Sequence, residues 1–140
     1  MTAQAIWLPS GEVRIEGIGF APEGSFHRVH DGEAEEAALN LDDDHALRHF
    51  LKVGVLCNDA ELAREEGHWK IHGDPTEGAL VVAAAKAGLE ARTRRGDHDR
   101  QDAIPFESAN KYMATLHEND GPHWLLAKGA PDRLLEMCHR

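Results

Sequence analysis

The 140-residue sequence has few cysteines, no long apolar run and no excess of positive charge. Its two cysteines, Cys57 and Cys138, show neither CxxC spacing nor a disulfide framework, so both are expected to be free core thiols in a reducing compartment. The longest apolar stretch, residues 78–85, is far shorter than the roughly 20 residues that cross a bilayer. No basic segment followed by an apolar one marks an export signal. We therefore expect that this chain does not insert into a membrane.

The formal net charge of −10 reflects 25 acidic residues against 15 lysines and arginines. Proteins that bind nucleic acid are usually basic, so nucleic acid is not an expected partner. An anionic ligand would have to meet locally concentrated cations instead of a general positive field. Two histidine pairs are spaced four apart, His45 with His49 and His68 with His72. Neither has a carboxylate or cysteine in ligand register, so no metal site is predicted.

Strand and helix patterns both occur along the chain, which predicts a single α+β domain over residues 1–140. Two short strands, residues 4–8 and 12–15, flank a Pro-Ser-Gly turn. The glycine-rich segment 17–24 is interrupted by proline and is interpreted as a turn, because no helix follows it to bind phosphate. Residues 29–42 are acidic and rich in alanine, which is typical of a solvated connector.

Apolar spacing predicts a first helical region from His45 to about Leu62, in which leucine, phenylalanine and valine recur three and four residues apart. This helix is expected to break near Cys57-Asn58-Asp59. Residues 90–102 mix acidic and basic side chains and are expected to form a loop or an exposed helix end. A last helix is predicted to begin at Pro131.

A second long helix is predicted from its start signals. Asp74 is a good N-cap, Pro75 suits the first helical position, and Glu77 stands three residues after the cap, where its side chain could reach back. The helix should continue to Gly88. Because residues 78–87 are apolar almost all round, it should be packed on more than one side.

The C-terminal third has the strongest pattern, that of an antiparallel meander. Its three strands are expected at residues 102–106, 111–117 and 123–128. If the Asp120-Gly121 turn is the centre of the last hairpin, the numbers of paired residues sum to 241, which places Lys128 opposite Met113. A four-residue connection, 107–110, would likewise place Phe106 opposite Lys111.

Alternation of side chains in this register puts Lys111, Met113 and Lys128 on one face of the sheet. One aromatic ring and two ammonium groups then converge, which suggests a nucleotide site with Phe106 stacked on the base and lysines near the phosphates. The alternative is that both lysines lie over apolar sheet and pair with surface carboxylates. A register slip by one residue would also move Lys128 to the other face.

Three segments resemble the nucleotide-binding domain of P-type ATPases, in particular its cation-transporting branch. They are residues 73–80 (GDPTEGAL), 106–113 (FESANKYM) and 128–131 (KGAP), and Cys57-Asn58-Asp59-Ala60 with residues 17–24 extends the likeness over nearly the whole chain. The resemblance implies an antiparallel sheet of about six strands flanked by helices. It also implies an ATP site formed by Glu77, Phe106, Ser108, Lys111, Met113, Lys128, Gly129 and Ala130.

Within that site the resemblance implies that Phe106 stacks on adenine, that Lys128 lines the deep end of the pocket, and that Lys111 reaches toward ribose or phosphate. Glu77 would contact the adenine side, with helix capping as a competing role. Ser108 stands where many animal pumps have arginine, so one phosphate contact is in doubt. None of these residues is expected to be catalytic.

The resemblance further implies a membrane-embedded parent pump driven by ATP and Mg²⁺, with this domain on the cytoplasmic side. Its partners would be the phosphorylation and actuator domains of the same parent chain. The acceptor aspartate of the family lies in an Asp-Lys-Thr-Gly-Thr segment that these 140 residues do not contain, so positioning of ATP is expected, not bond breaking.

Two other functions remain open from sequence. One is the equivalent domain of a lipid flippase, although the Asp74-Pro75-Thr76-Glu77 and Lys128-Gly129-Ala130-Pro131 forms favour the cation branch. The other is an interaction domain that has kept the fold without binding nucleotide, against which Phe106, Lys111 and Lys128 argue.

Overall fold

The computed structural model describes residues 1–138. Its elements fall into strands and helices in the following order: β1 (Ala5–Leu8), β2 (Gly11–Gly17), β3 (Gly24–His30), β4 (Glu33–Ala34), a 3₁₀ turn (Leu41–Asp43), α1 (His45–Leu56), β5 (Glu61–Glu65), β6 (His68–His72), α2 (Pro75–Lys86), α3 (Ala91–Asp97), β7 (Arg100–Glu107), β8 (Tyr112–His117), β9 (Trp124–Gly129) and α4 (Pro131–Met137). The predicted α+β class is confirmed.

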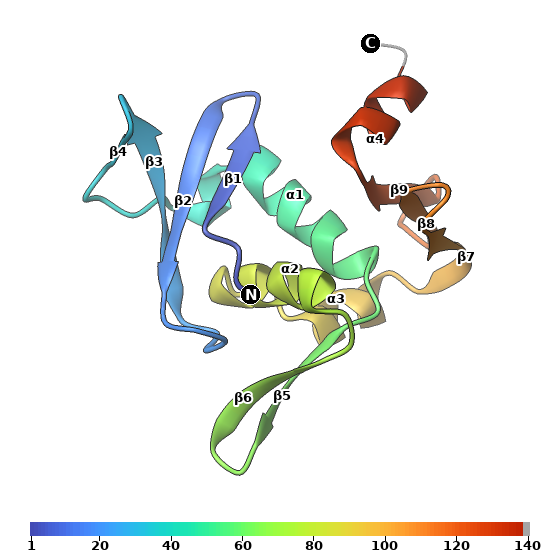
Figure 1. Ribbon diagram of the computed structural model, residues 1–140, viewed down its shortest axis with the longest axis horizontal. Coiled ribbons are helices and arrows are strands. Elements are labelled where there is room, and N and C mark those ends of the chain that lie inside the picture. The colour runs from blue at the N-terminus through green and yellow to red at the C-terminus, as the bar shows by residue number, and fades with distance from the viewer. Residues whose placement is uncertain (139–140) are drawn as a thin grey trace.

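The strands within residues 1–138 form three antiparallel sheets, ordered β1-β2-β3-β4, β5-β6 and β7-β8-β9. The sequence predicted one sheet of about six strands, whereas the strands within residues 1–138 are divided among three separate sheets. Figure 1 shows the reason: α1 and α2 cross the middle of the molecule, with β1–β4 on one side, β7–β9 on the other and the β5–β6 hairpin projecting away. Helices placed between sheets prevent the strands from meeting edge to edge.

A single apolar core joins the first sheet, both long helices and the last sheet. Its buried members are Ile6, Val13, Ile15, Phe26, Leu47, Leu51, Val55, Leu56, Cys57, Ala83, Ala84, Leu89, Met113 and Leu126. Leucine and valine on one face of α1 recur at the predicted spacing and supply its centre. As expected for a helix that is apolar all round, α2 packs against α1, α3 and the β5–β6 hairpin.

Several element boundaries differ from the sequence-based expectation. Helix α1 stops at Leu56 and residues 61–65 form β5, so the helical pattern does not continue to Leu62. The expected connector, residues 29–42, is partly strand, because β3 extends to His30 and Glu33–Ala34 form β4. Cys57 is buried as predicted, but the prediction for Cys138 is wrong, because it lies exposed just after the short helix α4.

The remaining helix, α3, is short and lies at the surface. Residues 91–97 form α3, which agrees with the expected exposed helix end in having no buried residue. Within residues 1–138, no helix is both long and apolar enough to cross a membrane.

Candidate functional site

Glu77 and Lys128 form the centre of the predicted site. Lys128 lies in β9 and Glu77 in the first turn of α2, and Lys128 Nζ donates to Glu77 Oε2 at 2.6 Å. Both side chains are mostly shielded from solvent, at 23% exposure for Lys128 and 18% for Glu77. The sequence left two explanations for the lysines, an anionic ligand or a carboxylate partner. Lys128 has a carboxylate partner, Glu77, on another element.

The start of α2 directs Glu77 toward the sheet. Asp74 caps the helix as predicted, because its Oδ1 accepts from the backbone N–H groups of Thr76 (2.8 Å) and Glu77 (3.1 Å). The Glu77 carboxylate does not reach back to the cap. It accepts instead from the Asp59 N–H at 3.3 Å and from Lys128, so Asp74 does the capping and Glu77 is free to face the sheet.

The predicted register between β8 and β9 is confirmed, with Met113 opposite Lys128 and His117 opposite Trp124. Met113 is only 4% exposed and belongs to the core, so it lies beneath the site. Gly129 and Ala130 lie at the rim of the predicted site. A Cβ on Gly129 would collide with the Lys111 carbonyl oxygen, and the Ala130 N–H donates to that oxygen at 2.9 Å.

The predicted pairing of Phe106 with Lys111 is wrong. Ile104 pairs with Ala114 and Glu107 with Tyr112, so β7 contains one extra residue between these pairs. This is a β-bulge at an edge strand, where Pro105 has no N–H to give to the ladder. Phe106 consequently lies across β8 from Lys128, roughly 10 Å away as two strand spacings, and the residue is 57% exposed.

Lys111 and Ser108 lie in the turn between β7 and β8. Lys111 has a left-handed backbone conformation (φ 61°) and its N–H donates to the Glu107 carbonyl at 2.9 Å. Because Lys111 precedes the paired part of β8, strand alternation does not determine the face on which it lies. Its ammonium has no carboxylate within 4 Å among residues 1–138, which leaves this exposed cation available to an anion.

Four residues that the sequence did not single out as functional hold the end of α1 beside this site: Asn58, Asp59, Arg95 and Arg100. Arg100 donates to the Asn58 carbonyl at 2.9 Å and pairs with the Asp59 carboxylate at 2.7 Å. Arg95 donates to the carbonyls of Val55 (3.1 Å), Asn58 (3.2 Å) and Ala60 (2.8 Å). The sequence signals for Asn58 and Asp59 were the expected helix break at residues 57–59 and the resemblance carried by residues 57–60, whereas Arg95 and Arg100 lay in a segment expected to be a loop or an exposed helix end.

Arginines suit this place because the last carbonyls of a helix are unpaired and carry partial negative charge. Burial lowers the pKa of Arg95 from its ordinary range, yet the carbonyl contacts satisfy its guanidinium. Burial also raises the pKa of the nearby Cys57 thiol. The thiol therefore stays neutral beneath β8 and β9, where it contacts the carbonyls of Met113 and Leu126 at 3.8 Å.

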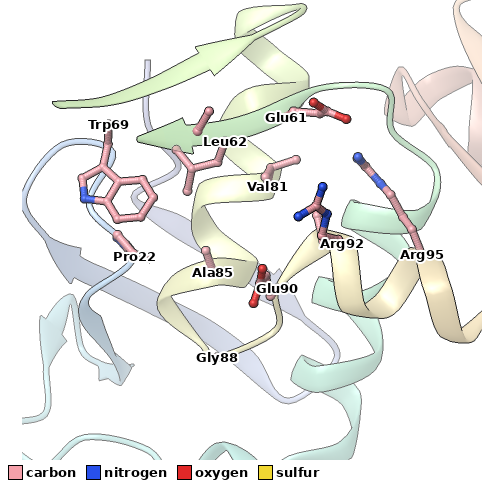
Figure 2. A pocket seen from close by; sticks show the side chains of 12 residues that line it. Pro22, Glu61, Leu62, Trp69, Val81, Ala85, Gly88, Glu90, Arg92 and Arg95 are labelled. Carbon is pink, nitrogen blue, oxygen red and sulfur yellow. The ribbon is translucent and has the colours of Figure 1, made fainter. Parts of the chain in front are cut away.

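A cavity of about 730 Å³ lies away from this site. It lies between the β5–β6 hairpin, α2 and α3. Figure 2 shows Trp69 and Leu62 at one side, Val81 and Ala85 on α2, and Arg92 further along. A second cavity of about 270 Å³ adjoins the end of α1. Neither of these two cavities is lined by Phe106, Lys111 or Lys128, and both Phe106 and Lys111 are exposed at the surface.

Comparison with known proteins gives a consistent result. Residues 46–140 match the family model described as "P-type ATPase, cytoplasmic domain N". The chain is 44% identical over 138 residues to the "Probable cation-transporting ATPase F" of Mycobacterium tuberculosis (strain ATCC 25618 / H37Rv), which covers 99% of this chain and 15% of that protein. It is 39% identical to the "Cation-transporting ATPase pma1" of Synechocystis over 138 residues, with the same coverage of both proteins.

A third relative is the "Calcium-transporting ATPase" of Bacillus subtilis, 33% identical over 141 residues, which covers 100% of this chain and 15% of that protein. The chain thus spans about 15% of the length of these curated relatives. The likeness covers the whole of this domain and only a small part of each relative.

Proposed function

We propose that this chain, which belongs to the cytoplasmic N domain of the P-type ATPases in their cation-transporting branch, binds ATP and positions it for phosphoryl transfer to an aspartate on a separate domain. The observation that carries the proposal is the Glu77–Lys128 contact at 2.6 Å, on a sheet whose edge strand exposes Phe106 and whose β7–β8 turn exposes Lys111. In a chain of net charge −10, this is a local place for an anionic ligand.

Each group suits one part of the nucleotide. Phe106 offers an open π-face for adenine. Glu77, when ionised, can only accept hydrogen bonds, so it suits the adenine amino group as a donor. Lys111 has no carboxylate within 4 Å among residues 1–138 and is available to ribose or phosphate. Ser108, Gly129 and Ala130 would form the rim, and Met113 would support it from the core.

The chemistry of this site is positioning. Holding ATP by its base leaves the γ-phosphate free to approach the acceptor. Such positioning supplies much of the rate enhancement of enzymatic phosphoryl transfer. Within residues 1–138, no three histidine, cysteine, aspartate or glutamate residues lie together as a metal-binding group. These residues do not fit a resident Mg²⁺, which the nucleotide phosphates would bring instead.

On this proposal the parent protein is an ATP-driven cation pump in a membrane, with this domain on the cytoplasmic side. Its partners there would be the phosphorylation and actuator domains of the same chain. The transported ion would be set by residues outside these 140.

NMR titration of the ¹⁵N-labelled chain with ATP tests the proposal. We expect shifts that cluster around Phe106, Lys111 and Lys128, with a Kd on the order of millimolar. Shifts that do not cluster there at high ATP concentration would contradict the site and favour an interaction domain that has the fold without the ligand. Tripolyphosphate at the same concentration is the control for binding by charge alone.

A further inference from the structure

Asn58 is a buried amide that lies between the end of α1 and the start of α2. It is 1% exposed. Its Nδ2 donates to the carbonyls of Gly54 and Glu77, both at 2.9 Å, and its Oδ1 accepts from the Ala60 N–H at 2.8 Å. Both donors and the acceptor of the side chain are therefore in use.

Asn58 and Asp59 bind Glu77 at its main chain and at its carboxylate, respectively. The Asn58 amide binds the main-chain carbonyl of Glu77, and the Asp59 N–H donates to its carboxylate Oε2 at 3.3 Å. That oxygen is the one that accepts from Lys128. The position of the Glu77 carboxylate relative to Lys128 is thus set from the turn that follows α1.

Side chains of two other elements, β7 and α3, bind this turn. Arg100 of β7 binds both the Asn58 carbonyl and the Asp59 carboxylate, and Arg95 of α3 binds the Asn58 and Ala60 carbonyls. A carboxylate that must meet both a lysine and a ligand needs neighbours that are themselves immobilised. The contacts of Arg95 and Arg100 supply such support to the turn.

We propose that Asn58 is a positioning residue of the nucleotide site, which acts through Glu77 and does not touch the ligand. This inference rests on the proposed function, since it concerns the same site. A purely structural amide would instead affect binding only through the stability of the whole domain, independently of Glu77.

A double-mutant cycle separates these two roles. Asn58→Ser removes the long reach to Gly54 and Glu77 but keeps a hydroxyl that can accept from the Ala60 N–H. We expect it to weaken ATP binding roughly fivefold, about the effect of one hydrogen bond. In a Glu77→Ala background the same substitution should change ATP affinity by less than about twofold. Equal losses in both backgrounds would overturn the proposal.

Val13→Ala is the matched control. Val13 is fully buried in β2, in the sheet on the far side of α1, so its truncation lowers stability without touching the site. We expect unchanged ATP affinity from Val13→Ala at a temperature where both variants are folded. A similar loss of affinity in both variants would show that stability alone explains the effect of Asn58→Ser.

A measurement on the unsubstituted chain covers the case in which Asn58→Ser does not fold. The side-chain amide resonances of Asn58 should shift as ATP saturates, together with those around Glu77. If the Phe106 resonances shift and the Asn58 amide resonances do not, Asn58 is not coupled to the site and the inference fails alone. If no resonance of the site shifts, the proposed function fails with it.

Discussion

Phe106 and Lys111 lie five residues apart, yet they would bind ATP by different physical means. Stacking of adenine on Phe106 is worth roughly 1–3 kcal/mol and depends little on salt. A contact between the exposed Lys111 and phosphate is screened by ions. Phe106→Ala should therefore weaken ATP, ADP and AMP by similar factors, whereas Lys111→Ala should weaken ATP more than AMP.

Titration of both variants with the three nucleotides, at low and high salt, checks this division. The difference between ATP and AMP in Lys111→Ala should shrink as salt rises. Equal losses for both variants across all nucleotides and salts would show that the roles of the ring and the cation are not separate.

His117 should make stability depend on pH. It is buried in β8, where its Nδ1–H donates to the His98 carbonyl at 3.0 Å and its Nε2 accepts from the Thr115 hydroxyl at 2.7 Å. Burial lowers the pKa of His117 below its ordinary 6.5. As pH falls below that value, the unfolded chain binds a proton that the folded chain does not, so the folded state loses stability.

We expect His117 to contribute a loss of up to about 1.4 kcal/mol of unfolding free energy per pH unit between pH 6.5 and its lowered pKa. Urea denaturation at pH 7.5, 6.5 and 5.5 measures it. Since other groups also titrate, His117→Gln is the reference, and its unfolding free energy should fall less steeply over this range. Identical slopes would contradict a role for His117.

At the scale of elements, α1 and α2 each contain one buried glycine, and the two should respond oppositely to alanine. Alanine is favoured over glycine within a helix by about 1 kcal/mol. At Gly54 of α1 a Cβ would meet Leu80 Cβ at 3.6 Å, an ordinary contact. At Gly78 of α2 it would collide with the Ile71 side chain of β6.

Gly54→Ala should therefore stabilise the domain by up to about 1 kcal/mol. Gly78→Ala should be less stable than Gly54→Ala by roughly 1–3 kcal/mol, because overpacking opposes the helix gain. Thermal and urea unfolding of the two variants measure the difference. Equal stabilisation of both would mean that the β5–β6 hairpin moves away from α2 without cost.

At the scale of the whole molecule, the arrangement joins segments distant in sequence at one open surface. Helix α2 contributes Glu77, β7 contributes Phe106, and β9 contributes Lys128. On the proposed function these groups would position ATP without an acceptor, since the 140 residues contain no Asp-Lys-Thr-Gly-Thr segment.

The purified chain should accordingly neither release phosphate from ATP with Mg²⁺ nor form a phosphoenzyme. A phosphate-release assay and labelling with γ-³²P ATP check this. Residual hydrolysis that is the same in Phe106→Ala would indicate contamination. Sustained hydrolysis that Phe106→Ala abolishes would contradict the interpretation of this chain as a positioning domain.

The sequence by itself determined what depends on near neighbours in the chain. The cap at Asp74 and the helix after it follow from a side chain that binds N–H groups two and three residues away. The pairing of Met113 with Lys128 follows from a connection centred on Asp120-Gly121 and the two-residue period of strands. Both were predictable because short connections leave the backbone few alternatives.

Only the tertiary structure decided which distant groups meet. The Glu77 carboxylate could have closed its own helix, but the packing of α2 beside β9 gave it Lys128, 51 residues away. The bulge at Pro105 moved Phe106 out of the simple register, and Asn58 meets both the Gly54 and the Glu77 carbonyls only where the end of α1 lies beside the start of α2. Contacts of this kind depend on how whole elements pack together, and local sequence patterns do not determine that packing.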